Sequence, residues 1–184
     1  AMTITIDSRS AKQPSTVASL AVAIAEGRDS CVAALGRARD SADRHAALNA
    51  LAWVDWAAAE AEAARIDAEI AAGRLSGPVA GVPVSIKDLF QVEGMPTRAG
   101  TRARLPALGP NEASLVTRLR EAGALVFAKA NMHEIALGAT GENEWTGDVL
   151  NPFDHARQSG GSSSGGGAAV AVGIGVAARS TPSC

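Results

Sequence analysis

The character of this sequence changes at the stretch Gly77-Pro-Val-Ala-Gly-Val-Pro-Val-Ser-Ile-Lys87. The stretch is rich in β-branched residues and punctuated by Gly and Pro, which predicts a turn that leads into a buried strand. Further along, the segment from Glu112 to Ala122 predicts a helix that ends at Gly123, and Ala124 to Ala128 predicts the next strand. A strand, a helix and a strand in this order favour an α/β sheet with covering helices.

The residues before Gly77 favour helices. Thr16 to Ala25 has apolar residues at helical spacing, and Ser30 is the expected N-cap of a second helix. Asp55 precedes a long helix rich in Ala and Glu, and residues 49–54 predict a short strand between the helices. This region contains no reactive constellation, so we expect it to pack against a larger unit.

The composition is that of an ordinary soluble globular protein. Hydrophobic residues make up 47% of the 184 residues, charged residues make up 20%, and the formal net charge is −2. A surface that binds nucleic acid normally shows basic excess, so no nucleic-acid partner is expected. The two cysteines, Cys31 and Cys184, give neither a disulfide framework nor metal-ligand spacing, which predicts a reducing cytoplasm. No secretory signal is apparent and no apolar run reaches about 18 residues, so no membrane association is expected.

Lys87 stands at the end of the apolar strand. A lysine aimed into a sheet is costly unless it is paired or neutralised. One interpretation is structural: strand alternation places the side chain at the surface, or Asp88 compensates its charge. The other interpretation is functional, and the position of the residue alone leaves both open.

A second unusual stretch is Gly160-Gly-Ser-Ser-Ser-Gly-Gly-Gly167. Its composition is typical of a flexible linker. However, the segment Ala168 to Ala178 follows directly and is apolar on every face, so we expect it to be buried. A Gly/Ser loop that opens a buried helix presents backbone N–H groups and hydroxyls at the helix N-terminus, where negative charge is favoured.

One further segment points to an alternative function. Val172-Gly-Ile-Gly-Val-Ala-Ala178 imitates the Gly-rich fingerprint of dinucleotide-binding domains. That fingerprint requires an acidic residue about 20 positions further on, and this position lies beyond Cys184. A nucleotide-binding α/β domain is therefore the alternative interpretation.

Taken together, these segments resemble the amidase signature family. The resemblance runs in unbroken order from about Gly77 to Ala178. Besides the two stretches above, it includes Gly94-Met-Pro-Thr-Arg-Ala-Gly100, Leu115-Val-x-Arg-Leu-Arg-x-Ala-Gly-Ala124, Lys129-Ala-Asn-Met-His-Glu134 and Asn151-Pro-Phe-Asp154. It implies a mixed β-sheet covered by helices on both faces. In this fold residues 1–75 form an N-terminal helical region, and residues 76–184 form the N-terminal part of the α/β core.

The resemblance also implies a function and a set of site residues. The function is that of an amidohydrolase, which cleaves a carboxamide C–N bond through an acyl-enzyme and needs no metal or organic cofactor. Lys87 is the implied base, and desolvation of a buried lysine lowers its pKa, so that the amine can accept a proton near neutral pH. Ser162 is the implied bridging serine, joined by a cis peptide to Gly161. Ser163 is implied as a supporting hydroxyl in the loop that starts at Gly160.

The sequence departs from the family pattern near these residues and at its end. Ser159 stands where Pro is usual, and Gly167 stands where Ser or Ala is common. The family's nucleophile belongs to a Gly-Thr-Asp-x-Gly-Gly-Ser segment about two dozen residues after the bridging serine, but the sequence there reads Arg179-Ser-Thr-Pro-Ser-Cys184 and only Thr181 fits. The spacing of Ser183 and Cys184 does not suit a nucleophile.

We therefore expect the nucleophile to be absent from these 184 residues, and the chain to be truncated and inactive on simple amides. A third interpretation follows, in which the chain is a non-catalytic homologue with an interaction role. An incomplete sheet would expose an edge and apolar surface, so association into homo-oligomers or coverage by a partner is expected. The implied substrate is a small-molecule amide of unspecified structure.

Overall fold

The computed structural model describes residues 16–105 and 111–179. Within them are five α-helices: α1 (Val17–Ala25), α2 (Cys31–Arg44), α3 (Trp56–Ala71), α4 (Ser114–Glu121) and α5 (Ser164–Ala171). Four strands accompany them: β1 (Leu51–Val54), β2 (Pro83–Lys87), β3 (Leu125–Ala130) and β4 (Ala177–Arg179). Two short 3-10 helices, η1 (Ala46–Leu48) and η2 (Glu134–Ala136), lie in the connections. The elements predicted from the sequence are therefore present, with small differences at their ends.

The strands form one mixed sheet in the order β1-β3-β2-β4. Strand β2 is parallel to both β3 and β4, whereas β1 is antiparallel to β3. The chain passes from β2 to β3 through α4, as expected for a parallel pair. Because β1 comes from the first 75 residues, the sheet draws on both parts of the chain. The division at residues 75 and 76 remains a prediction.

The helix starts follow the capping residues seen in the sequence. The Ser30 and Asp55 side chains accept hydrogen bonds from backbone N–H groups in the first turns of α2 and α3. The start of α2 is also held by a second contact, and the sequence did not indicate this contact. The carboxylate of Asp67, in α3, accepts the backbone N–H groups of Cys31 at 2.7 Å and Val32 at 3.0 Å. Helices α2 and α3 are thus joined by a charge-assisted cap.

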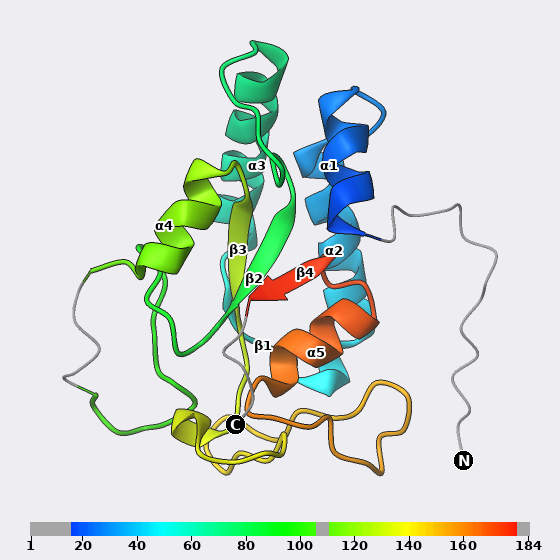
Figure 1. Ribbon diagram of the computed structural model, residues 1–184. Helices are drawn as coiled ribbons and strands as arrows, with labels where there is room; N and C mark the ends of the chain where they lie inside the picture. The colour runs from blue at the N-terminus through cyan, green and yellow to red at the C-terminus, as the bar shows by residue number, and fades with distance from the viewer. Residues whose placement is uncertain (1–15, 106–110, 180–184) are drawn as a thin grey trace.

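Two hydrophobic cores lie on opposite faces of the sheet. Leu125 and Phe127 of β3 belong to the first, which we call the α5-side core and which includes residues of α2, α3 and α5. Val84 and Ile86 of β2, with Val126 of β3, belong to the second, the α4-side core, which includes residues of α1 and α4. Alternate residues of a strand point to opposite faces, which explains this division along β3. Figure 1 shows α4 and α5 on opposite sides of the strands, so helices cover both faces as predicted.

The apolar segment after the glycine-rich loop is less buried than the sequence suggested. Helix α5 begins at Ser164, inside the loop, and its inner residues Ala168 and Ala169 are buried. Its outer side faces solvent, with Val170 40% exposed. The prediction that this whole segment is buried was therefore wrong, because a single helix that lies on a sheet buries only the side that contacts the strands.

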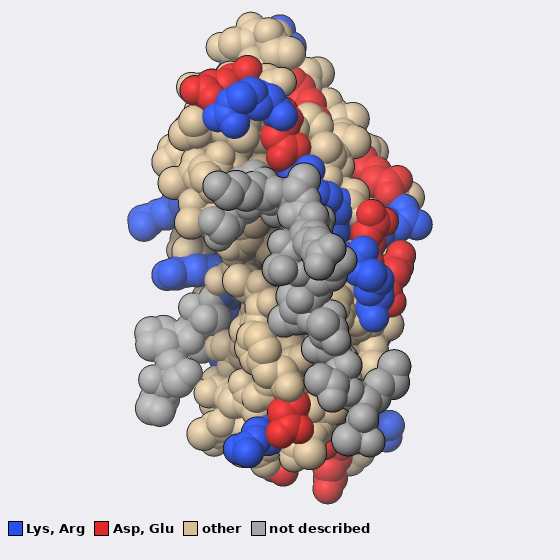
Figure 2. Space-filling view, turned by 90° about the vertical axis from the view of Figure 1, so that its right-hand side faces the viewer, with Lys and Arg blue, Asp and Glu red and all other residues tan. Residues whose placement is uncertain are grey.

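The outer surface carries charges of both signs. On the face shown in Figure 2, acidic and basic side chains lie close to one another at the upper end and along the right side. No broad basic region appears among the described residues on this face. Among the described residues, none of the helices has both the length and the apolar character that a membrane span requires.

Candidate active site

Lys87 is buried at the carboxyl end of β2. Its side chain is 1% exposed, and every residue of this strand is buried. The Nζ atom of Lys87 donates a hydrogen bond to Oγ of Ser162 at 2.8 Å, across 75 positions of sequence. The interpretation that alternation places this lysine at the surface was therefore wrong, because the strand is covered on both faces. The expected contact with Ser162 is confirmed.

Asp88, the next residue, contacts a different lysine. Consecutive strand residues point to opposite faces, so its side chain leaves the sheet on the side away from Lys87. There its Oδ1 lies 3.0 Å from Nζ of Lys129, and both side chains are buried. The structure thus assigns the Asp88 carboxylate to Lys129, whereas one sequence interpretation paired it with Lys87.

Ser162 lies immediately before α5, in a loop held by neighbouring backbone. The peptide bond between Gly161 and Ser162 is cis, as expected. The carbonyl oxygen of Ser162 accepts the backbone N–H of His133 at 3.1 Å. A Cβ atom at Gly161 would lie closer than 3.0 Å to the carbonyl of Thr140, so only glycine fits there. Gly160 has a positive φ of 77°, a conformation that glycine adopts at low cost.

The second half of the loop is equally well packed. The backbone N–H of Gly165 donates to the carbonyl of Asn131 at 2.9 Å. A Cβ atom at Gly165 would lie closer than 3.0 Å to backbone atoms of Ala50 and Asn131. The interpretation as a flexible linker was therefore wrong, because these glycines allow the helix start to approach neighbouring backbone. Ser163 occupies the N-cap position of α5, and its supporting role remains a prediction.

Sequence reasoning missed the polar network around Lys129. Its ammonium group contacts Asp88, donates to Oγ1 of Thr97 at 2.7 Å and donates to the carbonyl of Pro96 at 3.1 Å. Burial lowers the pKa of Lys129, and the Asp88 carboxylate opposes that change. A signal for this site is present in the sequence, because Lys129 stands in a strand as apolar as that of Lys87.

The segment that imitates a dinucleotide fingerprint has the wrong position in the fold. Residues 172–178 follow helix α5 and lead into strand β4. A dinucleotide-binding loop instead follows a strand and opens a helix, whose N-terminus receives the phosphates. Gly173 and Gly175 have positive φ values of 79° and 81° and shape the turn between the two elements. The nucleotide-binding interpretation therefore has no support in this segment.

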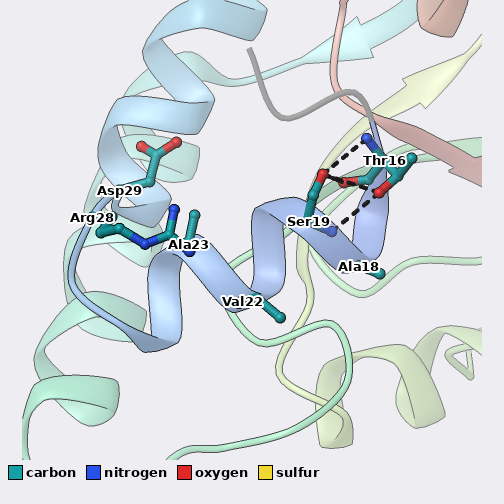
Figure 3. Close-up of a pocket in the computed structure, with 7 residues that line it drawn as sticks. All are labelled: Thr16, Ala18, Ser19, Val22, Ala23, Arg28 and Asp29. Atoms are coloured by element: carbon teal, nitrogen blue, oxygen red, sulfur yellow. Dashed lines mark hydrogen bonds between the residues drawn. The ribbon is translucent and has the colours of Figure 1, made fainter. Parts of the chain in front are cut away.

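A hollow elsewhere on the molecule does not include the predicted site residues. Its volume is about 670 Å³, and it is lined by residues of α1 and the turn that follows, including Thr16, Ser19, Val22 and Arg28. Figure 3 shows that Thr16 and Ser19 hydrogen-bond to one another at the start of α1. These contacts cap the helix, so the two hydroxyls have a structural role.

The C-terminal residues and the possible metal ligands are considered last. Thr181, Ser183 and Cys184 lie outside the described residues. Across residues 16–105 and 111–179, no group of three or more His, Cys, Asp or Glu side chains is arranged to hold a metal ion.

The arrangement is an α/β domain with a lysine and a serine in contact at the end of a buried strand, and solved structures share its fold. A crystal structure of an amidase has 52% sequence identity and a TM-score of 0.86, covering 89% of this chain and 37% of that one. The peptide amidase from Stenotrophomonas maltophilia has 33% identity and a TM-score of 0.80, covering 89% of this chain and 35% of that one.

Sequence comparison identifies the family. A family profile described as Amidase matches residues 33–181, so the chain belongs to the amidase family of amide-hydrolysing enzymes, those with the amidase signature. A curated relative from Acidothermus cellulolyticus, which is a component of a glutamyl-tRNA(Gln) amidotransferase, is 42% identical over 68% of this chain and 25% of its own length. The chain spans about a quarter to a third of the length of the curated relatives it matches.

Proposed function

We propose that this chain provides the base and the bridging serine of an amidohydrolase that cleaves the C–N bond of a small carboxamide. The observation that carries the proposal is the 2.8 Å contact between Lys87 Nζ and Ser162 Oγ at a buried position. Membership of the amidase family supports it. The roles of Lys87 and Ser162, and that of Ser163 as a supporting hydroxyl, are part of the proposal.

The proposed chemistry is a proton relay. Removing an amine from water disfavours its ammonium form, so a neutral Lys87 can accept the hydroxyl proton of Ser162. Ser162 in turn takes the proton of a nucleophilic hydroxyl, whose oxygen attacks the carbonyl carbon of the amide. The proton then returns through Ser162 to the leaving nitrogen as the C–N bond breaks. Water hydrolyses the resulting acyl-enzyme by the same relay.

The nucleophile is the part of this mechanism that these residues do not supply. The Gly-Thr-Asp-x-Gly-Gly-Ser segment that carries it in the family does not occur in the 184 residues. Lys87 and Ser162 can move a proton, but neither is proposed to attack the amide. We therefore propose that the catalytic unit is complete only when a segment with the nucleophile and its oxyanion-hole N–H groups adjoins the start of α5.

The test compares two polypeptides. The first is the 184-residue chain, and the second is a hybrid in which residues 1–179 continue into the part of the 52%-identical amidase that follows its matching region. Ammonia release from acetamide, benzamide and malonamate is measured for both, together with Lys87→Ala and Ser162→Ala variants. We expect turnover in the hybrid only, and its loss in both variants.

Each other outcome has a definite meaning. Turnover by the 184-residue chain that is lost in both variants would place the nucleophile within these residues. Turnover that persists in the variants would overturn the lysine–serine relay. A folded hybrid without activity would favour the alternative of a non-catalytic homologue with an interaction role.

A further inference from the structure

The buried ion pair behind the candidate active site suggests a role for Lys129. The sequence contains three lysines, Lys12, Lys87 and Lys129, and the last two are both buried at the ends of neighbouring parallel strands. Three acceptors surround the Lys129 ammonium group: the Asp88 carboxylate, the Thr97 hydroxyl and the Pro96 carbonyl. Three acceptors match the three N–H bonds of an ammonium group.

Asp88 is held on the same side by the segment 96–99. Its Oδ2 accepts the backbone N–H of Arg98 at 3.2 Å, and its main-chain carbonyl accepts that of Ala99 at 3.1 Å. Its own N–H donates to Ala130 of β3 at 3.0 Å. The carboxylate is therefore fixed on the face of the sheet away from Ser162.

This placement matters because Asp88 follows Lys87 directly in the chain. A carboxylate close to an amine favours the ammonium form, which cannot accept a proton. We propose that Lys129 is a positioning residue for Lys87: it holds the Asp88 carboxylate on the α4 side of the sheet and balances its charge. This inference rests on the proposed function, because it concerns the readiness of Lys87 to act as the base.

The other charged groups near Lys87 are placed differently from the buried Asp88–Lys129 pair. Arg179 pairs with Ile86 in the β2–β4 ladder and is exposed. His133 follows β3 and contacts Ser162 through its backbone. Strand β1 and helix α5 carry no titratable side chain, and the charged side chains of helix α2, which also contacts β2, are exposed or half-buried. Among the described groups on the packed elements, the Asp88–Lys129 pair is therefore the buried charge nearest to Lys87 in sequence.

The experiment uses the intact 184-residue chain and does not depend on turnover. Lysine labelled with ¹³C at Cε gives at most three NMR signals, which Lys12→Arg and Lys129→Arg variants assign. The Cε shift of Lys87 is followed against pH in the parent, in Lys129→Met and in the double variant Asp88→Asn/Lys129→Met. The single variant leaves the carboxylate without its counter-ion, and the double variant removes both charges.

We expect the midpoint of the Lys87 titration to rise by roughly 1 pH unit or more in Lys129→Met. It should return to the parent midpoint in the double variant and stay there in Lys129→Arg. An unchanged midpoint in a folded Lys129→Met protein, or an equal rise in the double variant, overturns the proposal. A purely structural role of Lys129 would not give this pattern, because removing the second charge would then not restore the parent midpoint of Lys87.

A milder variant keeps the test valid if Lys129→Met does not fold. Thr97→Val retains both charges and removes one acceptor of the ammonium group, so a smaller rise in the same direction is expected. An unchanged midpoint in folded Thr97→Val then overturns the proposal. Failure of the proposed function gives a different result, namely hybrid activity that survives Lys87→Ala, whatever the titration shows.

Discussion

The two faces of the sheet each hold a buried lysine at the end of a parallel strand, and the two lysines have different partners. On the α5 side, Lys87 contacts the hydroxyl of Ser162. On the α4 side, Lys129 contacts the carboxylate of Asp88 and two further oxygens. The comparison teaches that two equally buried lysines can differ in the chemistry that their partners allow. A carboxylate partner stabilises the ammonium form, whereas a hydroxyl partner offers a path along which a proton can move.

The largest expected effect is a loss of activity on the α5 side. In the hybrid polypeptide, Lys87→Ala and Ser162→Ala should each lower kcat/KM by at least about 1,000-fold, because each removes a member of the proposed proton relay. The measurement is ammonia release at saturating and limiting amide.

An exposed residue provides the control for this experiment. Arg74→Ala removes a surface ion pair with Glu69 at the far end of α3 and should keep the parent rate. A comparable loss in Arg74→Ala would show that the hybrid is merely fragile. Full activity in Ser162→Ala would remove the distinction between the two faces.

The next effect concerns the stability of the α4 side. Lys129→Met should lower the free energy of unfolding by about 3–5 kcal/mol, because it leaves a buried carboxylate without its partner. Adding Asp88→Asn should recover a large part of that loss, since the double variant has no unpaired buried charge. Urea unfolding of the parent, the two single variants and the double variant measures the coupling. If the two losses simply add, the ion pair is not the structural unit that the comparison assumes.

A smaller effect tests the packing on the α5 side, using two glycines of the same helix. Gly165→Ala should destabilise the protein by about 1–3 kcal/mol, because the added methyl group meets the backbone of Ala50 and Asn131. Gly167→Ala should be neutral or stabilising by up to about 1 kcal/mol, because nothing lies within 4 Å of its Cβ position and Ala favours a helix. Thermal unfolding of both variants measures these changes. Equal changes would contradict the close packing of the loop around Gly165.

The sequence predicted the fold well because its signals are local. Capping residues such as Ser30 and Asp55 act within one turn of the helix they start, and β-branched runs mark strands whatever lies beside them. The pairing of Lys87 with Ser162 is not local, since 75 positions separate them, and it came from the resemblance to a family. The residues next to Lys87 in the sequence are compatible with both a structural and a functional role for this lysine.

Other features could not be predicted because they depend on packing between elements. Nothing near Asp67 in the sequence indicates that its carboxylate caps α2, and nothing near Asp88 shows that its partner is Lys129. The exposure of Val170 likewise depends on which side of α5 contacts the sheet. Periodicity could not reveal that side, because every residue of the segment is small or apolar.

The smallest expected effect is a difference in pH dependence between the two faces. Cys31 belongs to the α5-side core, and its pKa is raised to about 12 by burial, with Asp67 and Glu62 adding to the effect. The folded protein therefore binds the thiol proton more tightly than the unfolded chain, whose value is near 9.0. The stability that this provides is complete below pH 9 and is lost as pH rises from 9 towards 12.

Lys129, on the α4 side, has a lowered pKa and should show the opposite slope. Its contribution is present above pH 10.5, the ordinary lysine value, and is lost as pH falls through the lowered pKa of the folded state. Between about pH 8.5 and pH 10, the parent should therefore lose about 1 kcal/mol relative to Cys31→Ala. Over the same interval it should gain stability relative to the double variant Asp88→Asn/Lys129→Met. Urea unfolding of the three proteins, all with Cys184→Ser so that Cys31 is the single thiol, measures both differences. If both stability differences change with pH in the same direction, the buried groups of the two faces do not differ in the way they bind protons. The contrast between Lys87 and Lys129 would then rest on their partners alone.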